Sequence, residues 1–129
     1  MEQQQSTCSC GPEDKTRIIY SCSGIGSNVG QLAKAAACQL ANERYGGGSC
    51  LAGIGGSYEK LVGIGKTTDE RIVIDGCPVA YAKMIMDDKG LMIDRFIMIT
   101  ELGIVKTPGA TFNENDLKTV IAAVRRPLP

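Results

Sequence analysis

The sequence predicts an α/β fold, a three-layer αβα sandwich around a four-stranded, mainly parallel, Rossmann-like sheet. Short apolar runs alternate with segments of helical periodicity in the order β-α-β-α-β-α-β-α. This alternation is typical of a parallel sheet with helices on both faces. The length of 129 residues suits one domain. We expect a flexible tail over 1–15, which is polar, and a single domain over 16–129.

The predicted elements follow one another with short connections. A buried strand over 17–21 leads through a glycine-rich turn into a helix over 28–44, with Ser27 or Asn28 as its N-cap. The later elements are expected to be a strand over 49–54, a short helix over 57–64, a strand over 71–74, a helix over 78–88 that starts at Pro78, a strand over 94–100, and a helix from 113 or 114 to 125.

Composition excludes several classes of function. The formal net charge is zero, Trp is absent and only 2 Phe occur, so neither a basic surface nor a base-stacking platform for nucleic acid is expected. No apolar run is long enough for a membrane span, and the polar start does not resemble a signal peptide. We therefore expect a cytoplasmic protein. In a reducing compartment, its 6 cysteines are better interpreted as metal ligands or redox thiols than as disulfides.

Three cysteines follow predicted strands. Cys22 comes directly after the first strand and Cys77 comes shortly after the third. Cys50 joins them if the second strand ends near Ser49, and lies deeper if that strand runs to Ile54. In open parallel sheets, ligands bind beyond the carboxyl ends of the strands. We expect a thiolate site for a soft metal there, and we also expect the adjoining helix starts to lower the pKa of the Cys22 and Cys77 thiols.

Zinc is the metal that this pattern favours. An iron–sulfur cluster is less expected because the Cys-x-x-Cys spacing is missing. Histidine is absent as well, so any metal must be held by Cys, Asp, Glu, backbone or an external ligand. Asp75 is interpreted as a ligand, an acid–base group or a helix cap, of which the cap is the commonest use.

The remaining cysteines fall outside this group. Cys38 lies on the helical face opposite the apolar one, so we interpret it as a surface thiol. Cys8 and Cys10 lie in the tail, where the Cys-Ser-Cys sequence is either a two-thiolate clip that folds over the site or a segment without a role.

Four short motifs in a fixed order resemble the DGC-domain family, small prokaryotic proteins that are named for an Asp-Gly-Cys motif and associated with zinc. The resemblance spans roughly residues 17–105, and the motifs read Ser21-Cys22-Ser23-Gly24, Gly26-Ser27-Asn28-Val29-Gly30-Gln31-Leu32, Cys50-Leu51-Ala52-Gly53-Ile54-Gly55 and Ile74-Asp75-Gly76-Cys77-Pro78. The resemblance implies a zinc site built from Cys22, Cys50 and Cys77.

Tyr81 stands where the family pattern has a further cysteine. A phenol is a much poorer zinc ligand than a thiolate, so the resemblance leaves the fourth ligand position open. Cys8, Cys10, Asp75, water and no ligand at all remain as candidates for it.

Two alternatives to a metal-binding module stay open. The first is a thiol-dependent redox or sulfur-handling enzyme, with Cys22 or Cys77 as the nucleophile at a helix N-terminus. The second is an anion- or nucleotide-binding domain in which backbone N–H groups of the glycine-rich turn hold the ligand and the cysteines are incidental. That turn has neither the Walker nor the dinucleotide spacing. Its candidate binding residues are Gly24, Gly26, Ser27 and Asn28.

Overall fold

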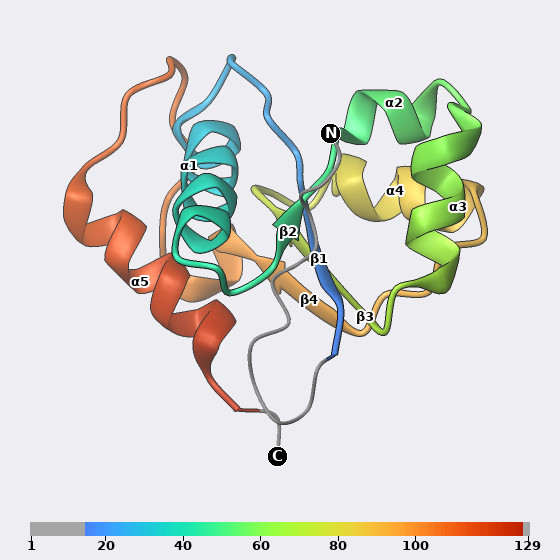
Figure 1. The fold of residues 1–129 in the computed structure, drawn as a ribbon. Coiled ribbons are helices and arrows are strands. Elements are labelled where there is room, and N and C mark those ends of the chain that lie inside the picture. Colours follow the sequence, from blue (N-terminus) through green and yellow to red (C-terminus); the bar gives the residue numbers. More distant parts are fainter. Residues whose placement is uncertain (1–14, 128–129) are drawn as a thin grey trace.

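A four-stranded parallel sheet forms the centre of the molecule in the computed structural model, which describes residues 15–127 (Figure 1). The strand order is β2-β1-β3-β4, and every neighbouring pair is parallel. The predicted α/β class is therefore confirmed. Apart from Lys15, the tail expected over 1–15 lies outside the described residues. The strands are β1 (Arg17–Ser21), β2 (Gly47–Gly48), β3 (Glu70–Asp75) and β4 (Arg95–Met98).

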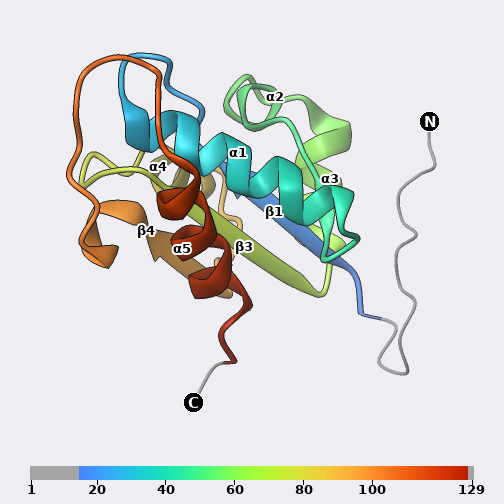
Figure 2. The same ribbon diagram turned by 90° about the vertical axis from the view of Figure 1, so that its left-hand side faces the viewer.

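Helices cover both faces of this sheet. Helices α1 and α5 lie on one face, and α2, α3 and α4 lie on the other (Figure 1). A view turned by 90° shows α1 and α5 side by side (Figure 2). Within residues 15–127, no helix has the length and apolar character needed to cross a membrane. The helices are α1 (Asn28–Asn42), α2 (Leu51–Gly55), α3 (Glu59–Thr67), α4 (Tyr81–Asp88), the 3-10 helix η2 (Ile99–Leu102) and α5 (Glu114–Arg125).

The two central strands are buried on both faces. Successive side chains of a strand point to opposite sides of the sheet. Ile19 and Ile72 accordingly pack in the core formed with α1 and α5. Tyr20 and Val73 pack in a second core on the other face, which includes Met86 of α4. This double burial explains why the strands are read as continuous apolar runs rather than as alternating ones.

The predicted position of the second strand is wrong. Strand β2 contains only Gly47 and Gly48, and most of the segment expected as a strand over 49–54 forms helix α2 instead. The helical turn buries Ile54 completely in the core beneath α2, α3 and α4. Periodicity alone does not distinguish a short apolar run in a strand from one in a buried helix. The strand therefore ends before Cys50, which brings that residue to the carboxyl edge.

Helix α4 starts at Tyr81 and not at Pro78 as the sequence suggested. Ala80 has a left-handed backbone conformation with φ of 55°, which separates the turn after β3 from the helix. The strand expected over 94–100 is also shorter, because β4 ends at Met98 and the chain winds into η2. The amide of Thr100 donates a hydrogen bond of 3.1 Å to the Gly76 carbonyl, which ties η2 to the loop after β3.

Candidate metal-binding thiol site

Cys22 and Cys77 lie beside each other at the carboxyl edge, after the paired strands β1 and β3. The Cys22 amide donates to the carbonyl of Ile74 at 3.2 Å, which continues the strand pairing by one residue. The amide of Gly76 then donates to Cys22 Sγ at 3.3 Å. Both cysteines are half-buried against the core formed with α1 and α5. The expectation that strands β1 and β3 bring these two residues to one edge is met.

The Cys22 thiol is held in its protonated form. Burial is the largest cause that raises its pKa, from 9.0 to about 11, and the negative charge of Asp75 and the neighbouring Cys77 raise it further. The hydrogen bond from Gly76 acts in the opposite direction but is outweighed. The prediction that a helix start lowers the pKa of Cys22 is therefore wrong. Helix α1 begins only at Asn28, and a helix dipole acts mainly within the first turn.

Cys77 has a cationic neighbour that the sequence pattern does not predict. Lys106 Nζ lies 3.5 Å from Cys77 Sγ, although the two residues are 29 positions apart. Asn28 fixes the loop that carries Lys106. Its side chain accepts a hydrogen bond from the Thr107 amide at 2.7 Å and donates one to the Val105 carbonyl at 2.9 Å. Only the tertiary fold brings this lysine to the site.

Asp75 is a helix cap. Its carboxylate accepts hydrogen bonds of 2.9 Å from the amides of Ala82 and Lys83, one to each oxygen. The residue is only 1% exposed. These amides belong to the first turn of α4, where they have no partner within the helix. The capping role that was expected most for Asp75 is confirmed, and both of its oxygens are occupied.

Cys50 occupies the same edge but is not part of the pair. It is the N-cap residue of α2, it is exposed, and its sulfur lies over its own helix, 3.9 Å from where a Cβ on Gly53 would stand. Gly48 is level with Ile19 of β1, so Cys50 reaches roughly the level of Ser21. Among residues 15–127, no three His, Cys, Asp or Glu side chains are grouped so that they could hold a metal ion.

Cys38, Cys8 and Cys10 complete the set of cysteines. Cys38 is exposed on α1, in agreement with its interpretation as a surface thiol. Cys8 and Cys10, which were considered as a clip over the site, lie outside the described residues.

The glycine-rich turn has a structural use. Ser27 caps α1 by accepting a hydrogen bond of 3.2 Å from the Gly30 amide, which confirms it as the N-cap. The Asn28 amide donates to the Thr107 carbonyl at 3.1 Å. A Cβ on Gly30 would stand 2.3 Å from the Gly24 carbonyl oxygen, so this close approach requires glycine. Several polar groups of the turn are thus engaged, while a Cβ on Gly24 or Gly26 would meet open space. Anion binding by this turn stays a prediction.

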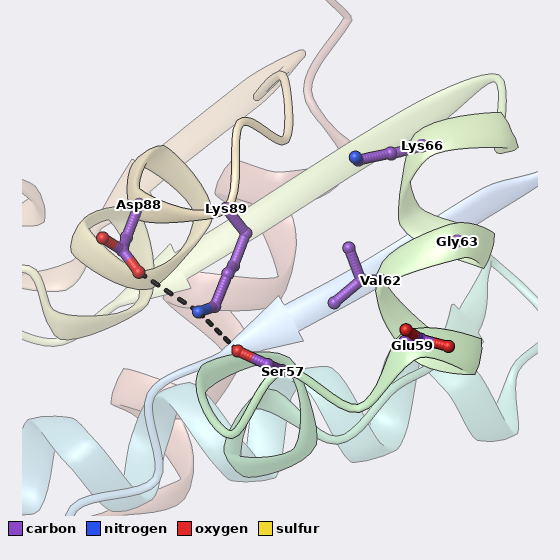
Figure 3. A pocket seen from close by; sticks show the side chains of 7 residues that line it. All are labelled: Ser57, Glu59, Val62, Gly63, Lys66, Asp88 and Lys89. Atoms are coloured by element: carbon purple, nitrogen blue, oxygen red, sulfur yellow. Dashed lines mark hydrogen bonds and ion pairs between the residues drawn. The ribbon is translucent and has the colours of Figure 1, made fainter.

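An open hollow of about 510 Å³ lies elsewhere, between α3 and the end of α4 (Figure 3). Lys89 crosses it and donates a hydrogen bond to the Ser57 hydroxyl at 2.8 Å, and it also pairs with Asp88 at 3.3 Å. The charge of this lysine is therefore already matched, and the hollow has no cysteine in its lining. It is lined by Ser57, Glu59, Val62, Gly63, Lys66, Asp88 and Lys89.

The fold and the edge cysteines define a small parallel α/β protein with a thiol pair beyond the ends of its central strands. Residues 18–124 match the DGC domain, so the chain belongs to the DGC-domain family, as its motifs suggested. It is 30% identical over 115 residues to the anaerobic and virulence modulator AnvM of Pseudomonas aeruginosa strain PAO1, and this match covers 89% of the chain and 87% of AnvM. No solved structure matches the chain.

Proposed function

We propose that this protein is a metal-binding module that takes zinc through the thiolates of Cys22 and Cys77, with Cys50 as a third ligand. The adjacency of Cys22 and Cys77 carries the proposal. The buried carboxylate of Asp75 lies near Cys22 and Cys77, and its negative charge contributes to keeping Cys22 protonated. A divalent cation reverses that effect, because a coordinating thiol gives up its proton. Two thiolates at this position are therefore more stable with a bound cation than without one.

The donor chemistry fits zinc, although the described ligand set is incomplete. Thiolate sulfur is a soft ligand that selects zinc, copper(I) or iron–sulfur clusters. A structural zinc site needs four ligands, whereas a catalytic one keeps a position open. Cys22 and Cys77 are neighbours at the carboxyl edge in the described structure, and Cys50 stands at the neighbouring strand end with its sulfur over α2. When bound, zinc would supply a Lewis-acid centre at the carboxyl edge.

The chain's own residues would prepare this site in two ways. The amide of Gly76 donates a hydrogen bond to Cys22 Sγ, and the ammonium group of Lys106 contacts Cys77 Sγ. Such contacts orient metal ligands and compensate their charge. Because Cys22 has to lose a proton on binding, zinc affinity is expected to rise with pH.

Metal analysis tests the proposal. The full chain, expressed and purified anaerobically without a nickel column, is expected to contain close to one equivalent of zinc. Cys22→Ser and Cys77→Ser should lose it, whereas Cys38→Ser, at the exposed site on α1, should retain it. Wild-type protein that holds less than about a tenth of an equivalent of any transition metal, with its thiols intact, would contradict the proposal.

The similarity to AnvM adds a context to the proposal. The name of that relative describes a modulator of anaerobic and virulence functions. We propose that this chain also has a modulating role. In this proposal it changes between a form without metal and a form with metal bound at Cys22 and Cys77. An apo protein and a zinc-loaded protein that present the same surface to protease digestion would argue against this extension.

A reactive thiol is the second candidate function, and the contact between Lys106 and Cys77 favours it. The pKa of about 11 makes Cys22 a poor nucleophile, which leaves Cys77 as the candidate. Loss of the Lys106 contact in Lys106→Met should then slow the reaction of Cys77 with iodoacetamide, while Lys34→Met should have no effect. A Cys77 that reacts at the same rate in both variants excludes assistance by Lys106.

A further inference from the structure

Cys77 and Lys106 bring two different nucleophiles into contact at the carboxyl edge. Lys106 Nζ lies 3.5 Å from Cys77 Sγ, and among the hydrogen bonds of residues 15–127 this is the only one that joins a lysine to a cysteine sulfur. Cys77 is half-buried and Lys106 is exposed, so a dissolved reagent can reach the pair. Neither of the functions proposed above gives the amine of Lys106 a chemical step of its own.

The backbone fixes both members of this pair. The Asn28 side chain forms hydrogen bonds of 2.7 and 2.9 Å to the backbone on the two sides of Lys106. An isolated antiparallel bridge between Ser27 and Pro108 continues this attachment. The Cys77 carbonyl accepts a hydrogen bond of 2.9 Å from the amide three residues further along, which fixes the turn after β3. The lysine side chain is therefore the one flexible part of the contact.

We propose that Cys77 and Lys106 form an acyl-transfer site that reacts with acyl thioesters and leaves the acyl group as an amide on Lys106. This inference rests on the reactive thiol proposed at Cys77 and identifies the substrate class of that thiol. It does not depend on the proposed zinc binding.

The transfer takes two steps, and neither uses an oxidant or a reductant. In the first step, Cys77 Sγ attacks the carbonyl carbon of the thioester. A bond forms between Sγ and this carbon, the bond to the donor sulfur breaks, and the donor leaves as a free thiol with the proton of Cys77. In the second step, the amine form of Lys106 attacks the same carbon. The new bond is to Nζ, the bond to Sγ breaks, and one proton passes from Nζ to Sγ.

The geometry of the contact suits the second step. A thioester on Cys77 has its carbonyl carbon one bond from Sγ, so an amine 3.5 Å from that sulfur is within reach of the carbon. Reacting groups held about 3–3.5 Å apart react far faster than the same groups free in solution. An amide is also more stable than a thioester, so the transfer runs toward Lys106. Cys38 and Cys50 are exposed, but within residues 15–127 neither sulfur has a hydrogen bond to a lysine, and an acyl group on them is expected to stay on sulfur.

Acetylation by acetyl-coenzyme A tests the inference. The full chain is incubated at about pH 8 with a chelator, so that its thiols are free of metal, and peptide mass spectrometry follows each lysine. Lys106 should be acetylated at least about tenfold faster than Lys66, an exposed lysine in a hollow without a cysteine in its lining. Cys77→Ser should reduce the rate at Lys106 to that at Lys66, whereas Cys38→Ser, which removes an exposed thiol on α1, should leave it unchanged. Far-ultraviolet circular dichroism checks that both variants fold.

Lys106→Met separates the two steps. This variant should form a thioester on Cys77 that persists and is released by hydroxylamine. Equal acetylation of Lys106 in the wild type and in Cys77→Ser would overturn the inference. A wild-type thioester on Cys77 that persists while Lys106 stays unmodified would also overturn it, although the reactive thiol would still stand. A wild-type chain in which neither Cys77 nor Lys106 takes up the acetyl group would refute both.

Discussion

At the scale of single residues, the Cys22 thiol is half-buried, accepts a hydrogen bond from Gly76, and has a pKa raised to about 11. Its position near a predicted helix start suggested an activated thiolate, but burial and the negative charge of Asp75 raise the pKa of the thiol instead. The same sulfur is a suitable metal ligand, because coordination replaces the proton. Burial therefore disfavours Cys22 as a nucleophile, and its role as a metal ligand stays a proposal.

Alkylation of the metal-free protein should reflect this difference. At pH 7.5, Cys22 should react with iodoacetamide about tenfold more slowly than Cys38. A pKa of about 11 in place of 9.0 lowers the thiolate population about a hundredfold, and the greater nucleophilicity of a more basic thiolate recovers part of this loss. Peptide mass spectrometry after timed quenching gives both rates from one sample. Equal rates, or a faster Cys22, would contradict the raised pKa.

The stability of the fold should fall in alkaline solution for the same reason. Because the pKa of Cys22 is higher in the folded chain, its protonated form stabilises the fold below about pH 9, and this contribution is lost as the pH rises from 9.0 to about 11. After allowance for the partial exposure of the thiol, the loss in the free energy of unfolding is about 1–2 kcal/mol. Tyr20, with a pKa raised to about 12 by burial, extends the decline to higher pH.

Urea unfolding at pH 8 and pH 10.5 measures this decline. In Cys22→Ala the difference between the two pH values should be smaller than in the wild type, whatever the absolute stability of the variant. Cys38→Ala, which removes an exposed thiol, serves as the control. An unchanged difference in Cys22→Ala would show that Cys22 does not contribute to the pH dependence.

At the scale of elements, the start of α4 depends on a carboxylate that lies outside the helix. Asp75 ends β3 and accepts the amides of Ala82 and Lys83, so one residue joins a strand to the helix after it. Asp75→Asn should reduce the free energy of unfolding by about 1–3 kcal/mol. The NH2 group of the asparagine side chain would replace one accepting oxygen and would face a backbone N–H donor without a hydrogen bond between them. Urea denaturation measures the change, with Asp87→Asn, on the exposed face of α4, as the control. Equal effects of the two substitutions would refute the capping role.

Helix α1 likewise depends on a close approach to the turn before it. A Cβ on Gly30 would stand 2.3 Å from the Gly24 carbonyl oxygen, whereas a Cβ on Gly63 in α3 would meet open space. Gly30→Ala should therefore destabilise the fold by about 1–3 kcal/mol through overpacking. Gly63→Ala should stabilise it by about 0.5–1 kcal/mol, because alanine is the better helix former. Thermal unfolding of both variants tests this, and changes of the same sign would contradict it.

At the scale of the whole molecule, periodicity predicted the alternation of strands and helices and hence the parallel sheet. It failed over 49–54, where an apolar segment as short as Leu51–Gly55 fits a strand or a buried helix equally well. It also placed the start of α4 at Pro78, because the cap on Ala82 comes from a side chain on another element. Local patterns contain no information about such partners.

The sequence by itself determined the α/β class, the family and the three cysteines that follow strands, because strand and helix periods are local and parallel strands share one carboxyl edge. Only the tertiary structure decided which groups meet there. It paired Cys22 with Cys77, left the Cys50 sulfur over its own helix, occupied Asp75 as a cap and brought Lys106 to Cys77. These outcomes depend on burial and on contacts between residues distant in the chain, which exist only once the sheet and both helical layers have packed together.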